Sequence, residues 1–236
     1  MTIWQHVPFE NEAAIGEWAR LRGITYRLIR CWEDEPLEAD DLLVVLGGSM
    51  SAYDDVDFLH REIEFLRQRI HDGGKIFGIC LGAQLLAHTM GASVYSSNTR
   101  EAGWRDIEML PHSLTANLEP KIKVFHWHGD TFDLPKECNR IATNDAFSNQ
   151  AFATPDGRIV ATQFHFETTA ESMNALLDED GSYLDFDSPY VDNASLVREG
   201  AHNSANANKA LFELLDQWVE VGSNSLHDAR IKRVFS

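Results

Sequence analysis

The sequence predicts an α/β domain with a mostly parallel central sheet, helices on both faces and a small antiparallel extension. In the first 91 residues, short apolar runs alternate with segments of helical periodicity, which gives the order β, α, β, α. The runs are apolar on both faces, as strands of a parallel sheet covered by helices are. After residue 91 the runs are shorter and are separated by Pro, Gly and Asp turns, which favours antiparallel pairing.

The first part of the chain is expected to form four strands and three helices. The strands read TIWQHVP, ITYRLIR, DLLVVLGGS and KIFGI. The first helix is expected to place Ile15, Trp18 and Leu21 on its apolar face. The apolar face of the second helix is expected to be made by Leu59, Ile63, Leu66 and Ile70. The third helix follows Cys80 and ends at Gly91, a favourable C-terminal cap.

The rest of the chain is expected to add short strands and a final helix. The strands read ASVYS, GWRDIEML, IKVFHWH, NRIATN and RIVATQFHFE. The segment from Thr168 to Val197 has seven acidic residues and no Lys or Arg, and its later part is predicted to be a solvated loop. A helix within residues 195–220 is expected to dock on the core. Because no linker or repeat interrupts the pattern, residues 1–236 are predicted to form a single domain.

Composition excludes several classes of function. The net charge of −17 argues against nucleic acid or an anionic membrane as the main partner, because both require a basic surface. No apolar stretch approaches the roughly 20 residues that span a bilayer, and the first residues do not resemble a signal peptide. We therefore expect a cytoplasmic protein. The odd number of cysteines, three, favours free thiols over a disulfide framework.

The stretch GICLG places Cys80 at a turn from a strand to a helix, with Gly78 and Gly82 on either side. Such a turn lifts a side chain clear of the sheet, and the following helix offers free N–H groups and the positive end of its dipole. Both favour a thiolate and can hold an oxyanion. The alternative is an inert cysteine, since this residue type is often buried.

A thiol nucleophile needs a base, and the stretch QFHFE offers one. His165 and Glu167 are two residues apart at the end of a strand, so their side chains project from the same face. The carboxylate could then hold one imidazole nitrogen while the other faces the thiol. A surface ion pair is the alternative.

Four motifs in order give the sequence its resemblance to the class I (triad-type) glutamine amidotransferases. They are VVLGGSMSAYDD, GICLGAQ, VFHWHGDTFDLP and QFHFE, within residues 42–167. The chain resembles most the branch related to the glutaminase domain of GMP synthetase. The resemblance implies a flavodoxin-like sheet. Two departures are Phe166 and Ser49, which stand where the family frequently has proline.

The resemblance also implies the roles of individual residues. Cys80 would attack a γ-carboxamide and form a glutamyl thioester. His165 would carry the proton to the leaving ammonia, and Glu167 would orient His165.

Further residues would bind the substrate. The resemblance implies that backbone N–H groups of Gly48 and Leu81 form the oxyanion hole. Gln84 and the backbone around Trp127 and His128 would hold the α-amino and α-carboxylate ends of the glutamyl group. No cofactor is expected.

A metal site is the less favoured reading of HWHGD. His126, His128 and Asp130 alternate along a strand and share a face, but no second cluster in the sequence completes the ligand set. We therefore expect no metal. Cys31 and Cys138 lack a neighbouring His motif and are expected to be structural or incidental.

Three functions follow from the sequence. The first is hydrolysis of glutamine by a glutaminase subunit that serves a separate synthetase, because the chain has no G-x-x-x-x-G-K-[ST] loop of its own. The second is a free-standing hydrolase of γ-glutamyl peptides or conjugates. The third is a non-catalytic protein with Cys80 as a redox sensor or with a binding pocket.

Overall fold

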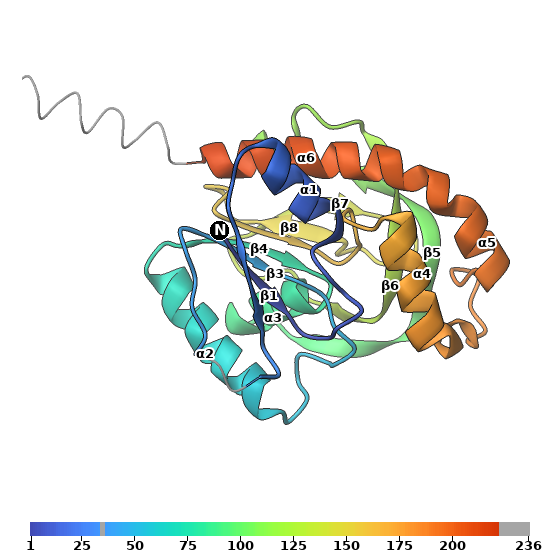
Figure 1. Ribbon diagram of the computed structural model, residues 1–236, viewed down its shortest axis with the longest axis horizontal. Coiled ribbons are helices and arrows are strands. Elements are labelled where there is room, and N and C mark those ends of the chain that lie inside the picture. Colours follow the sequence, from blue (N-terminus) through green and yellow to red (C-terminus); the bar gives the residue numbers. More distant parts are fainter. Residues whose placement is uncertain (34–35, 222–236) are drawn as a thin grey trace, which may run out of the picture.

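The computed structural model describes residues 1–33 and 36–221, which fold around one mixed β-sheet (Figure 1). The strand order in this part of the chain is β2-β1-β3-β4-β9-β8-β7-β5-β6. The first five strands in that order are parallel, and the remaining pairs are antiparallel. The parallel strands are β1 (Thr2–Gln5), β2 (Arg27–Arg30), β3 (Leu42–Val45), β4 (Lys75–Ile79) and β9 (Ile159–Thr162). The expected α/β class is therefore confirmed.

Helices cover both faces of the parallel strands. One face packs against α1 and α6, and the other packs against α2 and α3. In Figure 1, α6 accordingly lies beside α1 and away from α2. The bounds are α1 (Ala13–Leu21), α2 (Asp57–His71), α3 (Leu81–Thr89), α4 (Ala170–Asp180), α5 (Ala194–Glu199) and α6 (Ser204–Glu220).

Successive side chains along each strand point to opposite faces of the sheet, so the buried core residues form one cluster on each face. Ile3 belongs to the cluster beneath α1 and α6, whereas its neighbour Trp4 belongs to the cluster beneath α2 and α3. On α1, Ile15 and Trp18 are buried as expected. The expectation for Leu21 is wrong: this last residue of the helix is 51% exposed, because the chain turns away immediately after it.

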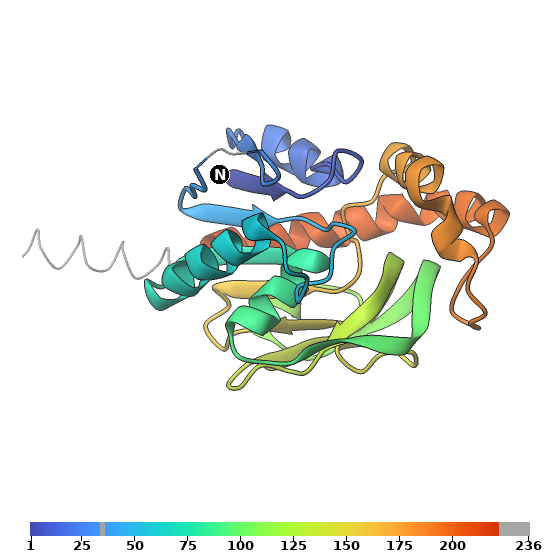
Figure 2. The ribbon, with the colours of Figure 1, turned by 90° about the horizontal axis from the view of Figure 1, so that it is seen from below.

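The antiparallel extension is built on one long strand. Residues expected to form two strands form one, β5 (Val94–Met109), which pairs with β6 (Lys121–Phe132). Its pairing shifts register between Ser96 and Glu101, and Figure 2 shows β5 and β6 together as a curved green ribbon. The strands β7 (Asn139–Thr143) and β8 (Ala151–Ala153) connect it to β9.

The acidic segment is not a single loop. It contains α4, the 3-10 turn η2 (Gly181–Leu184) and the start of α5. Residues 195–220, where a docking helix is expected, comprise most of α5, the 3-10 turn η3 (Gly200–Asn203) and α6. A short 3-10 turn, η1 (Ser113–Thr115), precedes β6. No helix in the described part of the chain is long and apolar enough to cross a bilayer.

Gly82 in α3 should be intolerant of any side chain. A Cβ atom there would lie 2.1 Å from the backbone oxygen of Val45, which cannot move without disturbing β3. We expect Gly82→Ala to lower the free energy of unfolding by at least about 2 kcal/mol, measured by urea denaturation. Gly181→Ala is the control, because a Cβ there meets nothing within 4 Å; an equal loss in both variants would contradict the packing argument.

Candidate active site

Cys80 occupies a strained turn between β4 and α3. Its backbone has φ 50° and ψ −104°, a region that L-residues rarely adopt and that is tolerated where the surroundings enforce it. Two glycines make the turn compact, since a Cβ on Gly78 would lie 2.6 Å from the oxygen of Gly82. The Cys80 N–H donates to Thr162 O at 2.8 Å. The side chain is thereby fixed at the carboxyl end of the central strand.

Polar groups surround the Cys80 sulfur, although the residue is only 6% exposed. The Gln163 side-chain amide donates to Sγ at 3.6 Å, and the Trp127 carbonyl oxygen lies 3.8 Å away as an acceptor for the thiol. The Gln84 amide donates in turn to Gln163 Oε1 at 3.2 Å. Sγ therefore has both a hydrogen-bond donor and an acceptor, which limits its side-chain rotation.

His165 and Glu167 lie beside each other immediately after β9. The distance from His165 Nδ1 to Glu167 Oε1 is 2.6 Å, and both residues are buried. An isolated bridge from His165 to Phe125 on β6 anchors the backbone, with His165 N donating to Phe125 O at 2.8 Å. Since Glu167 engages Nδ1, the other ring nitrogen is free to face the thiol.

The charges of the thiol and the imidazole are coupled. Burial alone would lower the pKa of His165, but the Glu167 carboxylate and the Cys80 side chain outweigh it, and this pKa lies well above its usual value. Burial raises the pKa of the Cys80 thiol, and His165 opposes that rise. A proton can thus pass between two groups that are in contact, with the carboxylate stabilising the imidazolium.

The backbone supplies two N–H groups near the sulfur. Gly48 follows β3 and lines the same cavity as Cys80. Leu81 is the first residue of α3, so its N–H has no partner within the helix. Both groups are suited to hold a developing negative charge on a carbonyl oxygen.

A cavity of about 360 Å³ opens onto Cys80. It is lined by four other residues expected at the site, namely Gly48, Gln84, Trp127 and His128, and by a wall of charged and aromatic side chains: Glu10, Arg100, Asp130, Asp180, Tyr183 and Phe186. His165 and Glu167 line an adjoining cavity of about 20 Å³. The structure therefore places the expected residues around two adjoining cavities, except Leu81, which lines neither of them and directly follows Cys80 in the chain.

The segment after Gly181 covers part of this cavity. Tyr183 stacks on Trp127 with ring centroids 5.3 Å apart, and Trp127 Nε1 donates to Asp180 at 3.0 Å. The Arg100 guanidinium lies over the rings of Tyr183 and Phe186, at 4.4 and 4.6 Å from their centroids. The segment expected to be solvated is thus a wall of the cavity, because its aromatic residues pack on β5 and β6.

Sequence reasoning missed several residues of the site, among them Glu10 and Gln163 beside the proposed catalytic groups. Glu10, in the loop after β1, lines both cavities and lies against Gly47 and His165. Burial raises its pKa, and the nearby His165 opposes that rise. Gln163 contacts the thiol from the end of β9. Position is a signal for both, since both follow parallel strands whose carboxyl ends meet at the same edge of the sheet. Gln163 is also the first residue of the QFHFE motif.

Two clusters among the described residues contain ligand types for a metal ion. One is His6, Cys31 and Glu62, and the other is Glu101, His126 and His128. In the second, the Glu101 carboxylate already accepts hydrogen bonds from His128, Asn144 and Gln150. Asp130, considered with the two histidines in the sequence, instead accepts hydrogen bonds from Ser51 and Tyr53, so it lies outside that cluster.

Known proteins resemble the chain over most of its length. The glutamine amidotransferase-like protein YfeJ of Salmonella typhimurium is 28% identical over 225 residues, which cover 90% of this chain and 94% of that protein. A crystal structure of a glutamine amidotransferase from Thermotoga maritima superposes with a TM-score of 0.82 at 30% identity, covering 93% of this chain and 97% of that one.

A third relative is similar over part of its length only. GMP synthase from Vibrio atlanticus is 34% identical over 105 residues, which are 43% of this chain but 20% of the synthase. The model of the family "Glutamine amidotransferase class-I" matches residues 14–181, which include the turn at Cys80 and the His165–Glu167 pair. The chain therefore belongs to the class I glutamine amidotransferase family and is related to the glutaminase part of GMP synthases.

Proposed function

We propose that this protein hydrolyses the γ-carboxamide of glutamine or of a γ-glutamyl amide through a thioester on Cys80. The observation that carries the proposal is the position of the Cys80 thiol, at a strained turn beside the buried His165–Glu167 pair and open to a cavity. A structural cysteine needs none of these features.

The reaction divides into two steps at the same carbon atom. The Cys80 sulfur attacks the amide carbon while its proton passes to His165, and the N–H groups of Gly48 and Leu81 hold the resulting oxyanion. When the C–N bond breaks, His165 gives its proton to the leaving amine. A water molecule then loses a proton to His165, attacks the thioester and releases glutamate, which restores the thiol.

Glu167 acts through His165. Its carboxylate holds the Nδ1 proton, which fixes the ring tautomer and stabilises the imidazolium that forms in each step. It does not need to take up the proton itself.

Charged groups in the cavity suit a glutamyl substrate. Arg100 carries the charge opposite to an α-carboxylate, and Glu10 carries the charge opposite to an α-ammonium group. Gln84 and the backbone of Trp127 and His128 remain our proposed contacts for the same two ends. The Gln84 amide N–H already bonds to Gln163, so Gln84 would contribute its remaining polar atoms.

The size of the cavity supports a second candidate for the leaving group. A volume of about 360 Å³ lies in the range of sites that hold ligands larger than a single amino acid. A γ-glutamyl peptide or amine would fit the same chemistry with a larger leaving amine than ammonia. If glutamine is the substrate, a separate synthetase is the proposed acceptor of the ammonia.

The three proposed catalytic residues should differ in the cost of their removal. We expect Cys80→Ala to abolish turnover and His165→Ala to lower kcat by about 10³-fold, because the proton carrier is lost. Glu167→Ala should lower kcat less, since His165 remains. The measurement is glutamate release by variants whose fold is verified by circular dichroism. Equal losses in the His165 and Glu167 variants would contradict the assigned roles.

A substrate panel separates the two leaving groups. Purified protein is incubated with glutamine and, in parallel, with γ-glutamyl peptides and γ-glutamyl amines, with Cys80→Ala as the blank. Unaided turnover of a panel member well above that of glutamine would identify a free-standing hydrolase. Weak release from glutamine alone would support a subunit that depends on a synthetase, and no release from any compound would contradict the proposed reaction.

The charge of Glu10 should hold a proton on the Cys80–His165 pair. The negative carboxylate opposes loss of that proton, so Glu10→Gln is expected to lower the pH midpoint at which Cys80 becomes reactive toward iodoacetamide. The sign follows because a neutral amide removes an unfavourable interaction with the thiolate. Glu17→Gln, on the exposed surface of α1, is the control and should leave the midpoint unchanged. A midpoint that rises in Glu10→Gln would contradict this electrostatic account.

A further inference from the structure

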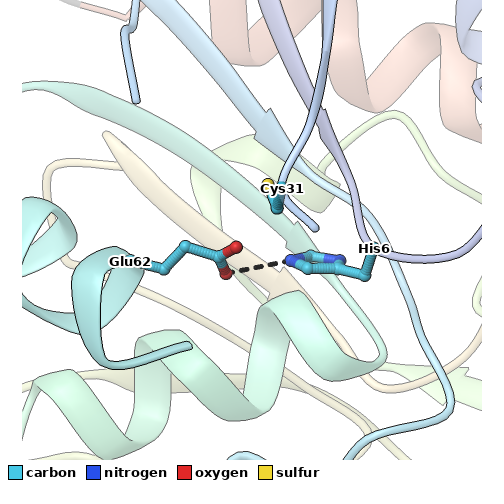
Figure 3. A group of neighbouring side chains, drawn as sticks. All are labelled: His6, Cys31 and Glu62. Carbon is cyan, nitrogen blue, oxygen red and sulfur yellow. Dashed lines mark hydrogen bonds and ion pairs between the residues drawn. The ribbon is translucent and has the colours of Figure 1, made fainter. Parts of the chain in front are cut away.

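A second buried histidine–glutamate pair lies behind the proposed oxyanion hole. His6 follows β1 and is 2% exposed, and Glu62 on α2 is 0% exposed. Figure 3 shows the two side chains facing each other, with Cys31 beside them. The distance from His6 Nε2 to Glu62 Oε2 is 3.0 Å. A charged pair at this depth is costly to bury, so its contacts point to a specific role.

The other ring nitrogen of His6 binds the turn made by Gly47 and Gly48. His6 Nδ1 lies 2.9 Å from the carbonyl oxygen of Gly47, and this oxygen can only accept a hydrogen bond. Nδ1 must therefore carry a proton. Burial alone would lower the pKa of His6, but the Glu62 carboxylate outweighs it and this pKa is raised, which agrees with a ring that donates from both nitrogens.

This hydrogen bond fixes the direction of the next N–H group. The peptide between Gly47 and Gly48 is trans, so the Gly48 N–H points away from the Gly47 oxygen and hence away from His6. Gly48 lines the cavity together with Cys80, whereas His6 does not. Among the described residues, no hydrogen bond engages the Gly48 N–H. It remains available on the side of the cavity.

The turn made by Gly47 and Gly48 needs the hydrogen bond from His6, because the two glycines alone do not fix the backbone conformation. A Cβ on Gly48 would lie 2.8 Å from His6 Cβ and 2.9 Å from Leu81 Cδ2, so only glycine fits there. Two consecutive glycines have wide conformational freedom, and Ser49 after them does not fix φ as a proline would. A flipped peptide would aim the Gly47 carbonyl at the oxyanion instead of the Gly48 N–H.

We propose that His6 is a positioning residue, which holds the Gly47 carbonyl so that the Gly48 N–H faces the oxyanion, with Glu62 holding His6 in turn. The inference rests on the proposed amide hydrolysis. His6 acts on the transition state through the backbone and does not touch the substrate. A hydrogen bond to the Gly47 oxygen also polarises the peptide, which strengthens the Gly48 N–H as a donor.

A metal ion would compete with this arrangement. His6, Cys31 and Glu62 include the donor types of a zinc site. Both nitrogens of His6 are already engaged by Gly47 and Glu62, however, and burial raises the pKa of Cys31, which favours the protonated thiol over a thiolate ligand. The same three residues are thus better explained as support for the turn.

Two polar variants of His6 test its hydrogen bonds to Gly47 and to Glu62 separately. In His6→Asn, the amide reaches the position of Nδ1 and can still donate to Gly47, but the bond to Glu62 is lost. In His6→Gln, the amide reaches the position of Nε2 and can keep Glu62, but the bond to Gly47 is lost. The variants therefore exchange one interaction for the other at similar polarity.

The readouts are kcat and KM for the best γ-glutamyl substrate, the melting temperature and the rate at which iodoacetamide alkylates Cys80. We expect His6→Gln to lower kcat by about 10- to 100-fold with little change in KM, because a donor to the oxyanion is misplaced. His6→Asn should stay within about fivefold of the wild type. Alkylation should be unchanged in both variants, because this displacement forms no oxyanion.

Three outcomes would overturn the inference. One is a kcat for His6→Gln equal to that of the wild type. Another is a loss of kcat that parallels the loss of melting temperature across the two variants, whether or not the hydrogen bond to Gly47 is kept. The third is stoichiometric zinc in the purified protein that is lost in Cys31→Ser. If the wild type itself releases no glutamate from any γ-glutamyl compound, the proposed function fails, and the inference fails with it.

Discussion

The whole site depends on the sharp turn at Cys80. Its positive φ is maintained because the chain on both sides is packed too tightly to relax: Gly78 contacts the backbone of Gly82, and Gly82 contacts the backbone of Val45. These contacts tie β4, α3 and β3 together at the carboxyl ends of the central strands. The turn therefore sets both the position of the thiol and the distance from it to the glycines after β3.

Two histidines, each paired with a buried carboxylate, flank the reaction centre on different sides. His165 and Glu167 lie on the side of the Cys80 thiol, and His6 and Glu62 lie behind the turn made by Gly47 and Gly48. These residues come from parts of the chain that are distant in sequence, namely the end of β9, the loop after β1 and helix α2. They meet where the carboxyl ends of the parallel strands lie. In our proposal, the first pair handles the proton, and the second holds the backbone that receives the negative charge.

Sequence patterns could predict the fold class and the turn at Cys80, because both depend on local periodicity and on glycines at fixed spacing. The same reasoning failed for Leu21, which has the helical spacing of a core residue but is the last residue of α1, where the chain turns toward β2. It also missed Glu10 and Gln163, and it gave no role to His6. Gln163 begins the QFHFE motif, but the motif does not show that its side chain reaches the thiol, and Glu10 and His6 belong to no motif. All three become part of the site because the parallel topology brings strand ends together.

The central claim is a covalent glutamyl thioester on Cys80, and its direct test is to trap that species. The protein is mixed with glutamine or a γ-glutamyl amide, quenched in acid within a turnover, digested and analysed by mass spectrometry. The account predicts a glutamyl adduct on the peptide that contains Cys80 and on neither of the peptides with Cys31 and Cys138. Glutamate release without any adduct on Cys80, or an adduct on another cysteine, would contradict it.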